Sequence, residues 1–433
     1  MSIALTTVVL FAVFFCLLAL SVPISVSILI SSVVTALTTL SWDQVVFICM
    51  QKMNSGVESF SLLAVPLFIL AGNIMNNGGI ARRMINFAKL FCGFIPGSLA
   101  QANVLGNMLF GALAGSAVAA ASAMGGSINP IQKEEKYDMA YATAVNIASA
   151  PTGLLIPPTS AFIVYSTVVG GVSISALFMA GYIPGILMGL GVMVVAYLYA
   201  RAHKYPTTGV VPLKTALKIT LDAMPSFLLI IIVIGGIVSG VFTATEGAAV
   251  CVVYCLFLSV LYRSITMEKF TKILVDSACT SGIILFLIST SSAMSWVMAY
   301  SGIPDAIAEG LLSLSDNKYM IFFLINLILL IVGMFMDITP AILIFTPIFL
   351  PICVSLGMSP VHFGVVLIFN MCIGSMTPPV GSVLFVGCGI NKISIERVSM
   401  MLLPYFAVLI AILLLLTYVP AISLFIPEMM GLV

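Results

Sequence analysis

Long apolar segments, separated only by Pro, Gly or short polar loops, follow one another along almost the whole chain. Residues 2–42, 90–132, 139–200, 338–391 and 398–427 contain no Asp, Glu, Lys or Arg. Because about 20 apolar residues suffice for a transmembrane helix, the pattern predicts an all-α polytopic membrane protein. We expect simple spans near 4–21, 23–41, 58–77, 173–200, 222–242, 245–262, 276–300 and 398–419.

The first apolar run does not have the form of a cleaved signal. No Lys or Arg precedes it, and a second apolar run follows from Pro23 without a polar break. A secretory signal normally begins with a positively charged region. We therefore expect the N-terminal segment to remain attached as a membrane helix.

Two regions, 96–171 and 320–390, are apolar throughout but contain clusters of Gly and Pro that a plain spanning helix does not need. A shift of 221 residues places one region on the other without a gap. Gly153 then falls on Gly374, and the Pro157-Pro158 pair falls on Pro378-Pro379. Two double prolines in register indicate two internal repeats.

Composition supports the membrane assignment and excludes other classes of protein. Hydrophobic residues make up 61% of the chain and charged residues only 7%, against about 25% charged in soluble domains. A net charge of +1 offers no basic surface for nucleic acid. The nine Cys are scattered and the two His lie far apart, so neither a disulfide framework nor a histidine-based metal site or triad is expected.

The positions of the cations predict how the repeats are threaded through the membrane. If 98–130 and 320–356 are re-entrant hairpins, fourteen of the 16 Lys and Arg fall on the cytoplasmic side of the membrane. Only Lys52 and Lys318 fall on the other side. The first hairpin then opens from the cytoplasm and the second from outside, so the repeats are inverted, as in many secondary transporters. The predicted organisation is 1–57 N-terminal scaffold helices, 58–200 first repeat with a broken helix at 137–171, 201–275 connecting scaffold helices, 276–390 second repeat with a broken helix at 360–390, and 391–433 C-terminal helix.

Broken helices at membrane depth expose carbonyl groups that bind cations and N–H groups that bind anions. We expect each helix to restart at Pro158 or Pro379, since proline is tolerated in the first helical turn. An all-oxygen site suits sodium better than a transition metal. The candidate sodium ligands are Gly115, Ser116, Thr152, Gly153, Asp337, Thr339, Gly374, Ser375 and Thr377. The candidate substrate-binding residues are Ser116, Thr159, Thr339, Thr377 and Gly381.

Each of these assignments has a structural alternative. A single Gly/Pro break is as compatible with packing as with binding, and Ser or Thr hydroxyls commonly bond carbonyls of their own helix. Glu246 could cap a helix as readily as take part in transport. Asp337 stands apart, because a carboxylate between long apolar flanks is a functional candidate by default.

Six segments resemble the large membrane subunit of the tripartite ATP-independent periplasmic (TRAP) transporters, and the resemblance covers residues 1 to about 425. It implies a sodium-coupled importer of organic anions in the bacterial inner membrane, with an elevator-type transport domain moving against a scaffold domain. It also implies a small four-helix membrane subunit and a periplasmic substrate-binding protein, but no cofactor other than the coupling sodium ions. The segments are Ser59 to Phe68, Gly115 to Ala119, Ile156 to Thr159, Phe242 to Glu246, Met336 to Pro340 and Thr377 to Gly381.

The chain departs from this family at Ala120, where family members usually carry an acidic residue. Asp337 is then the only carboxylate at a hairpin tip, and neither broken segment contains Lys or Arg. We therefore expect half-helix N-termini, hydroxyl groups and bound sodium to hold the anion. Sugar acids and small dicarboxylates both fit the family.

Three other functions remain as alternatives. A stand-alone sodium/carboxylate symporter could use the same architecture without a binding protein. An intramembrane enzyme is disfavoured, because Asp337 has no acidic or histidine companion in its own segment. A passive channel would leave the paired breaks without a role.

Overall fold

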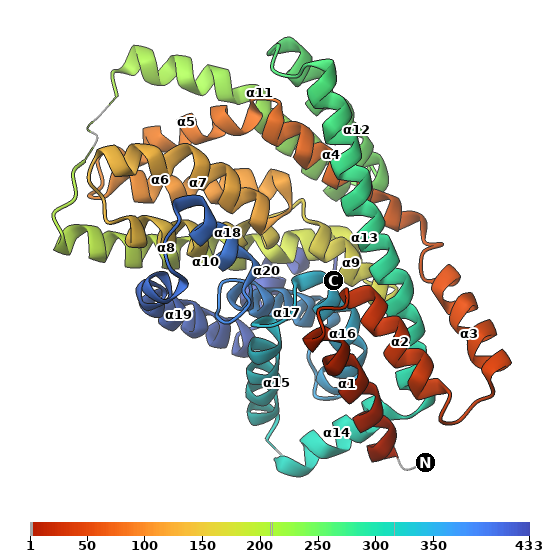
Figure 1. Ribbon diagram of the computed structural model, residues 1–433. Helices are drawn as coiled ribbons and strands as arrows, with labels where there is room; N and C mark the ends of the chain where they lie inside the picture. The colour runs from red at the N-terminus through yellow and green to blue at the C-terminus, as the bar shows by residue number, and fades with distance from the viewer. Residues whose placement is uncertain (1–2, 208, 210, 316) are drawn as a thin grey trace.

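The computed structural model describes residues 3–207, 209, 211–315 and 317–433, and these residues form helices and turns without a strand. Figure 1 shows their arrangement. The elements are α1 (Ile3–Ala19), α2 (Ile24–Ala36), α3 (Trp42–Ser55), η1 (Phe60–Leu63), α4 (Ala64–Asn77), α5 (Ile80–Cys92), α6 (Ser98–Ala114), α7 (Ala117–Glu134), α8 (Met139–Ser149), η2 (Ala150–Leu154), α9 (Ser160–Val169), α10 (Ile174–Ala202), α11 (Leu213–Val238), α12 (Ala244–Leu261), α13 (Met267–Tyr300), α14 (Ile303–Leu314), α15 (Lys318–Gly333), α16 (Ile338–Ser355), α17 (Pro360–Gly374), α18 (Ser382–Asn391), α19 (Ile395–Tyr418) and α20 (Ala421–Met429).

The prediction of an all-helical membrane protein is confirmed. Among the described residues, seven helices are long and apolar enough to cross a membrane. They are Phe60–Asn77, Ile174–Ala202, Leu213–Val238, Ala244–Leu261, Met267–Tyr300, Ile338–Ser355 and Ile395–Tyr418.

Several predicted helix boundaries are wrong. The spans expected to start at 222 and 276 start at Leu213 and Met267, so both helices include Lys residues in their first turns. A lysine near a helix end can extend its ammonium group to the membrane surface, so it does not mark the end of the helix. The span expected over 23–41 ends at Ala36, where the Thr38 and Thr39 hydroxyls bond carbonyls of the last turn.

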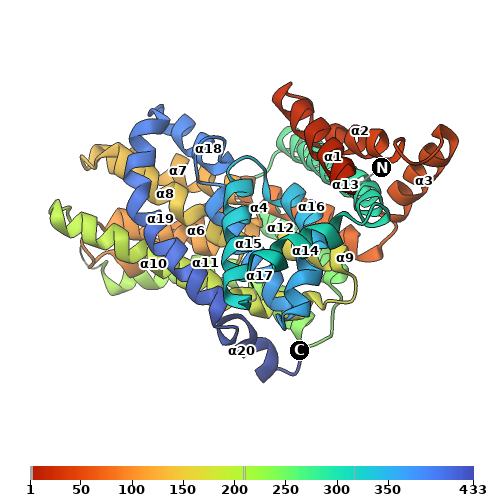
Figure 2. The ribbon, with the colours of Figure 1, turned by 90° about the horizontal axis from the view of Figure 1, so that it is seen from below.

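The N-terminal helices and the helices at the opposite end of the molecule are well separated. Helices α1, α2 and α3 lie next to α13 at one end, whereas α8, α10 and α19 lie together at the other end (Figures 1 and 2). Two helix pairs and two interrupted helices make up much of the remainder of the molecule. The pairs are α6/α7 and α15/α16, and they contact the interrupted helices α8/α9 and α17/α18. This arrangement places α8, η2 and α17 inside the molecule, where their residues are almost all buried, whereas α18 is buried on one side only.

The two apolar regions with Gly/Pro clusters have closely matching helix boundaries. Helices α7 and α16 are both 18 residues long, and they begin 221 residues apart. The Pro157–Pro158 and Pro378–Pro379 peptide bonds are both cis. The expected restart at Pro158 and Pro379 is wrong, because α9 begins at Ser160 and α18 at Ser382. At the first restart the Thr159 hydroxyl accepts a hydrogen bond from the Ala161 N–H at 3.2 Å, so a side-chain cap rather than a proline starts the helix.

Pairs of glycines hold each interrupted helix against the neighbouring helix pair. A Cβ on Gly111 of α6 would lie 2.5 Å from the Cα of Gly153. A Cβ on Gly374 of α17 would lie 2.5 Å from the Cα of Gly333 in α15. Only glycine permits backbones to approach this closely. The two interruptions also touch each other, since the Cys372 thiol lies 3.4 Å from the Pro151 carbonyl oxygen.

Candidate functional site

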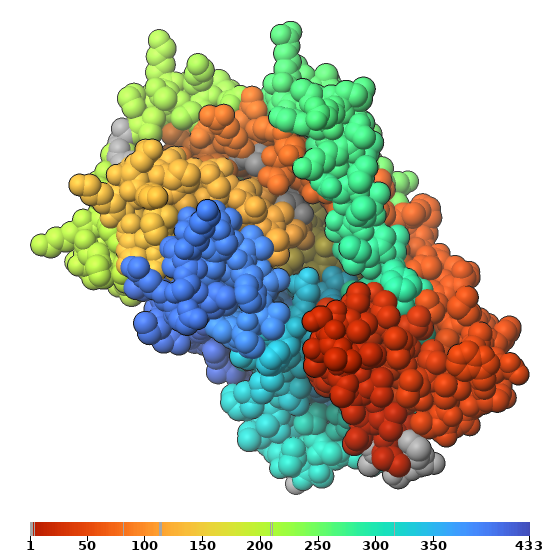
Figure 3. All heavy atoms as spheres, in the orientation of Figure 1, coloured from red at the N-terminus to blue at the C-terminus, as the bar shows by residue number. Residues whose placement is uncertain are grey.

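A single cavity of about 480 Å³ joins the tips of the two helix pairs. In Figure 3 the surface is hollowed beside α13 (green), between it and α6–α7 (yellow-orange). One side of the cavity is formed by α4 and α13, and the other side by the two tips and the two interrupted helices. The polar residues in its wall are Asn73, Asn76, Ser116, Ser122, Ser160, Thr280, Asp337, Thr339, Ser375 and Ser382.

Four helices begin at this cavity. Its wall includes the first residues of α7, α9, α16 and α18, which are Ala117, Ser160, Ile338 and Ser382. The N-terminus of a helix carries free N–H groups and a partial positive charge, so it attracts anions. Four such termini at one cavity are suited to a negatively charged ligand.

Asp337 is the only ionisable residue among those that the structure places in the cavity wall. It occupies the N-cap position of α16 without a side-chain cap bond, and its side chain is exposed. The Ser382 hydroxyl donates to Asp337 Oδ1 at 3.4 Å. The carboxylate therefore has little else to bind within the protein, and its oxygens are available to a cation.

Backbone carbonyls beside Gly381, the residue before Ser382, add further oxygens. A Cβ on Gly381 would lie 2.8 Å from the carbonyl oxygen of Ser375 and 2.9 Å from that of Thr377. These carbonyls accept hydrogen bonds from the Val383 and Gly381 N–H groups, and each retains a second lone pair. Carboxylate, carbonyl and hydroxyl oxygens are the ligands that hard cations prefer.

The structure brings some of the predicted site residues together and leaves others behind the cavity wall. Gly115, Ser116, Asp337, Thr339 and Ser375 line the cavity. The remaining predicted residues lie in or beside the interruptions but not in the cavity wall, and their roles as ligands stay predictions. They are Thr152, Gly153, Thr159, Gly374, Thr377 and Gly381.

Three predicted hydroxyl ligands donate to carbonyls of their own segment. Thr152 bonds the Ser149 carbonyl oxygen at 2.6 Å, Thr377 bonds that of Ile373 at 2.6 Å, and Ser375 bonds that of Cys372 at 2.8 Å. Such bonds use the hydroxyl proton but leave lone pairs on the oxygen. These hydroxyls can still accept or coordinate, but they cannot donate to an anion at the same time.

The residues predicted from the sequence do not include Asn73, Asn76 and Thr280, which α4 and α13 contribute to the cavity. The Asn73 amide is held in place by a 2.8 Å bond to the Ser277 hydroxyl of α13. The signal that could have indicated Asn73 and Asn76 is their spacing, three residues apart and so on one side of an apolar helix. Only the tertiary structure brings Thr280 beside them.

Ala120 and Glu246 lie away from this cavity wall. Ala120 is fully buried, and its Cβ lies 3.8 Å from the position of a Cβ on Gly111, beside the contact between Gly111 and Gly153. The capping role of Glu246 is confirmed, since its carboxylate accepts from the Thr243 N–H at 2.8 Å and its N–H donates to the Thr243 hydroxyl at 3.2 Å. Asp337 therefore remains the charged group at the cavity.

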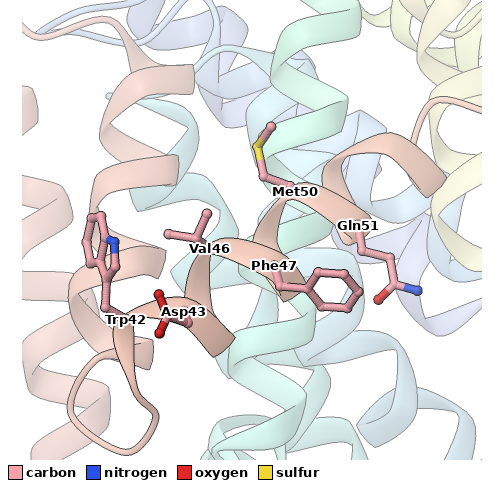
Figure 4. A pocket seen from close by; sticks show the side chains of 6 residues that line it. All are labelled: Trp42, Asp43, Val46, Phe47, Met50 and Gln51. Atoms are coloured by element: carbon pink, nitrogen blue, oxygen red, sulfur yellow. The ribbon is translucent and has the colours of Figure 1, made fainter.

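A separate depression of about 500 Å³ lies on the outer surface of α3 (Figure 4). Its six lining residues all belong to α3, and they include exposed Trp42, Phe47 and Met50. None of the predicted site residues lies there. An apolar face on one exposed helix suits contact with lipid or with another protein chain better than recognition of a small anion.

Comparison with known proteins identifies the family. A family model described as "Tripartite ATP-independent periplasmic transporter, DctM component" matches residues 11–422. The chain belongs to this family. It is therefore a multi-pass TRAP permease of the bacterial inner membrane and not an enzyme.

Individual relatives match over nearly their whole length. The protein YgiK of Salmonella typhimurium is 52% identical over 98% of this chain and 97% of its own length. The C4-dicarboxylate TRAP transporter large permease protein DctM of Rhodobacter capsulatus is 34% identical over 99% of this chain and all of its own length. The crystal structure of the Alcanivorax borkumensis YdaH transporter matches the fold with a TM-score of 0.60, at 13% identity, over 87% of this chain and 89% of that one.

Proposed function

We propose that this TRAP permease carries out sodium-coupled uptake of a small organic anion, a dicarboxylate or a sugar acid, across the bacterial inner membrane. The observation that carries the proposal is the cavity where four helix N-termini meet a single carboxylate, Asp337. The DctM relative, whose name refers to C4-dicarboxylates, supports the same class of substrate.

In this proposal, the charges around the cavity make binding of the anion dependent on a cation. No Lys or Arg is present among the residues described in the cavity wall, so helix N-termini and hydroxyls bind the anion together with sodium held near Asp337. Opposite unit charges 4 Å apart attract by about 4 kcal/mol at the effective dielectric of a protein surface. Anion binding is then weak until sodium has bound, and this dependence couples the two fluxes.

The family assignment supports two partners for the chain. A tripartite transporter requires a small membrane subunit, which we propose has four helices, and a periplasmic protein that delivers the substrate. The test is uptake of 14C-labelled succinate and gluconate into proteoliposomes that contain the chain with both partners. Accumulation that requires an inward sodium gradient is expected. Equal accumulation with potassium in place of sodium contradicts sodium coupling, and uptake by the chain alone favours a stand-alone symporter.

We further propose that the two repeats are inverted and that they move together as an elevator along α13. One face of α13 supports this proposal, because Thr280 and Ile284 line the central cavity while Ile288, Ser291 and Ser295 line a second cavity of about 260 Å³. These positions are three or four residues apart and therefore share one side of the helix. Thr280 and Ser291 are separated by about 16 Å along the helix axis.

The elements that face α13 across the second cavity also belong to the moving part in this proposal. Thr167 of α9 and Leu343 of α16 form that wall, and both helices begin at the central cavity. A displacement of about 16 Å along α13 would bring the tip at Ser116 from the level of Thr280 to the level of Ser291. The polar hydroxyls at both levels are suited to a polar ligand, with Ile284 and Ile288 between them.

Disulfide cross-linking tests this displacement. We expect the pair Ser116→Cys with Thr280→Cys and the pair Ser116→Cys with Ser291→Cys both to cross-link in a transporting sample, because the tip visits both levels. The exposed Cys16 and Cys279 are first replaced by Ser. Mobility shifts on gels measure the cross-linked fraction. Ser116→Cys with Gly282→Cys is the control, since Gly282 is two residues from both Thr280 and Ile284 and so faces the other side of α13. Cross-linking of the Thr280 pair alone contradicts the displacement.

A further inference from the structure

A cluster of polar side chains is buried inside the unit formed by α6, α7 and α8, which lie side by side in Figure 1. All of its members are at most 2% exposed, and none lines the central cavity. They are Asn103 and Asn107 of α6, Asn129 and Gln132 of α7, and Asn146 and Ser149 of α8. We refer to these six residues as the amide cluster.

At the inner end of the amide cluster, several oxygens surround one side-chain nitrogen. The Asn107 Nδ2 atom lies 2.9 Å from Asn103 Oδ1, 3.1 Å from Asn146 Oδ1 and 2.7 Å from Ser149 Oγ. The Asn146 carbonyl oxygen lies 3.4 Å from the same nitrogen. An amide nitrogen carries two protons, so it cannot donate to all three side-chain oxygens at once, whereas the Asn146 carbonyl already accepts from the Ala150 N–H.

At the outer end of the cluster the side chains have no protein partner. Within the part of the chain that the structure describes, both polar atoms of the Asn129 and Gln132 side chains are buried without a hydrogen bond. At the inner end, Asn103 Nδ2 and Asn107 Oδ1 are also buried without one. Buried polar groups in native proteins are nearly always satisfied by protein or by ordered water. The cluster therefore needs a ligand that the protein itself does not supply.

In the matching helices α15 and α17 of the second repeat, the buried polar groups lie at other positions and satisfy one another far better. Asn370 donates to Asn326 Oδ1 at 2.8 Å, and Asn326 donates to the Thr417 hydroxyl at 2.9 Å. His362 in turn contacts the Ser423 hydroxyl at 2.6 Å. Only Asn370 Oδ1 is left over in this network within the described chain. The requirement for an added ligand is thus a property of the first repeat.

The mixture of unsatisfied atoms indicates the chemical class of the ligand. The six atoms without partners comprise three amide nitrogens, which donate, and three amide oxygens, which accept. A sodium ion could satisfy the oxygens only. Water donates and accepts, and buried water typically makes about three hydrogen bonds to such groups. Water molecules are therefore the ligands that fit the whole cluster.

The polar positions on α7 form a continuous line along one side of the helix. The Ala121 carbonyl accepts from Asn146 Nδ2 at 2.8 Å. At Gly125, the amide nitrogens of Asn146 and Asn129 both lie within 3.3 Å of the position that a Cβ would take. Gln132 follows Asn129 by three residues, on the same side of the helix. From Ala121 to Glu135 this line is about 21 Å long.

The two ends of the line lie at functionally different places. Ser149 directly precedes η2, the interruption of the first broken helix, and its carbonyl accepts from Thr152. Glu135 follows the last residue of α7, and one of its carboxylate oxygens is buried with no partner among the described residues. Burial lowers the pKa of the nearby Lys89, and the Glu135 carboxylate opposes that shift. The distribution of Lys and Arg places this end of α7 at the cytoplasmic face.

We propose that the amide cluster holds a file of water molecules that connects the first interrupted helix with the cytoplasm, and that the coupling cation is rehydrated through this file when it is released. This role rests on the proposed sodium coupling. The line of amides supplies partners for the water molecules, and Glu135 attracts the cation to the cytoplasmic end. The cation that leaves this way is one held at the first interrupted helix, where Thr152 and Gly153 are predicted ligands, and it is distinct from the sodium near Asp337 in the central cavity.

The first experiment detects the water directly and needs no substrate. Purified transporter is exposed to a synchrotron X-ray pulse in ¹⁸O-labelled water, and modified residues are identified by mass spectrometry. Bound water generates hydroxyl radicals that oxidise adjacent side chains. We expect oxidation of Met124 and Ile128, although both are fully buried, and at least a fivefold reduction in Asn129→Leu with Gln132→Leu. Absence of oxidation at both residues in the unmodified chain overturns the proposal.

The second experiment separates release of sodium from carriage of the anion. Net uptake of ¹⁴C-succinate requires sodium to be released inside, whereas exchange of succinate at equal saturating sodium on both sides does not. Asn129→Leu with Gln132→Leu is expected to slow net uptake at least tenfold and to change exchange less than twofold. These side chains have no partner to lose, so apolar replacements are compatible with folding. Equal slowing of both modes, or of neither, overturns the role in release.

Matched variants distinguish the file from general damage. Gly125→Ala narrows the line beside Asn129 and Asn146, whereas a Cβ on the adjacent Gly126 would meet nothing within 4 Å. We expect Gly125→Ala, but not Gly126→Ala, to slow net uptake selectively. Asn326→Leu breaks the satisfied network of the second repeat and should slow both modes together. A wild-type transporter that carries succinate without sodium would refute the coupling itself, and footprinting would still report the water.

Discussion

Asp337→Asn is expected to remove most sodium-dependent uptake while the protein remains folded. The carboxylate is exposed to the central cavity and has one protein contact, the 3.4 Å bond from Ser382. Asn is nearly as good an N-cap residue as Asp, so α16 should still begin at Ile338. Loss of a hydrogen bond or contact to a charged group costs about 1.5–3 kcal/mol, which corresponds to a roughly 10- to 150-fold lower affinity for sodium.

The measurement is the initial rate of uptake in proteoliposomes over a range of external sodium concentrations. We expect the sodium concentration for half-maximal uptake to rise, together with a fall in the maximal rate. Asp305→Asn is the matched control, because Asp305 lies exposed in the first turn of α14, away from the cavity wall. Asp337→Glu should keep partial activity, since it retains the charge with a longer side chain. An Asp337→Asn transporter with the sodium dependence of the wild type would show that the carboxylate does not bind the cation.

The sequence predicts those parts of the fold that depend on local chemistry. Apolar run length locates most membrane helices, and the Gly/Pro clusters locate both interruptions to within a few residues. Asp337 could be singled out because a carboxylate within a long apolar segment is rare, and the structure places it at the cavity. These inferences need only neighbouring residues.

Features that depend on distant contacts could not be derived in the same way. Thr280 and Asn73 come from helices far apart in the sequence, yet both line the cavity opposite the tips. The amide cluster looks in the sequence like scattered Asn residues in apolar helices, and only the packing of α6, α7 and α8 brings Asn107 beside Asn146. The predicted spans begin at 222 and 276, beyond the nearby lysines, but Lys214 and Lys269 lie within α11 and α13. In each case the tertiary structure, not local pattern, decides the outcome.

The pairs of close glycines suggest why the interruptions need such precise packing. A break in a membrane helix leaves backbone groups unsatisfied, and the surrounding protein must hold them in place. Gly333 and Gly374 allow α15 to lie directly against the end of α17, next to Ser375 in the cavity wall. Gly111 and Gly153 do the same for α6 and η2. The position of the cavity oxygens thus depends on glycines that do not themselves line the cavity.

Gly374→Ala is therefore expected to abolish uptake and lower stability, although it adds a single methyl group. The new Cβ would lie 2.5 Å from the Cα and carbonyl carbon of Gly333, and backbone atoms cannot rotate away as a side chain could. Overpacking of this kind typically costs about 1–3 kcal/mol, which exceeds the roughly 1 kcal/mol that alanine gains over glycine in a helix. Separation of α15 from α17 would also displace the Ser375 carbonyl from the cavity.

Gly389→Ala is the matched control, because Gly389 lies inside α18 and a Cβ there would meet nothing within 4 Å. It should keep uptake and, through the higher helix propensity of alanine, gain slightly in stability. Thermal unfolding of the purified proteins and initial uptake rates measure the two effects separately. If Gly374→Ala and Gly389→Ala behave alike in both assays, the contact between Gly333 and Gly374 does not hold the second interruption in place, and the cavity oxygens must be fixed by other residues.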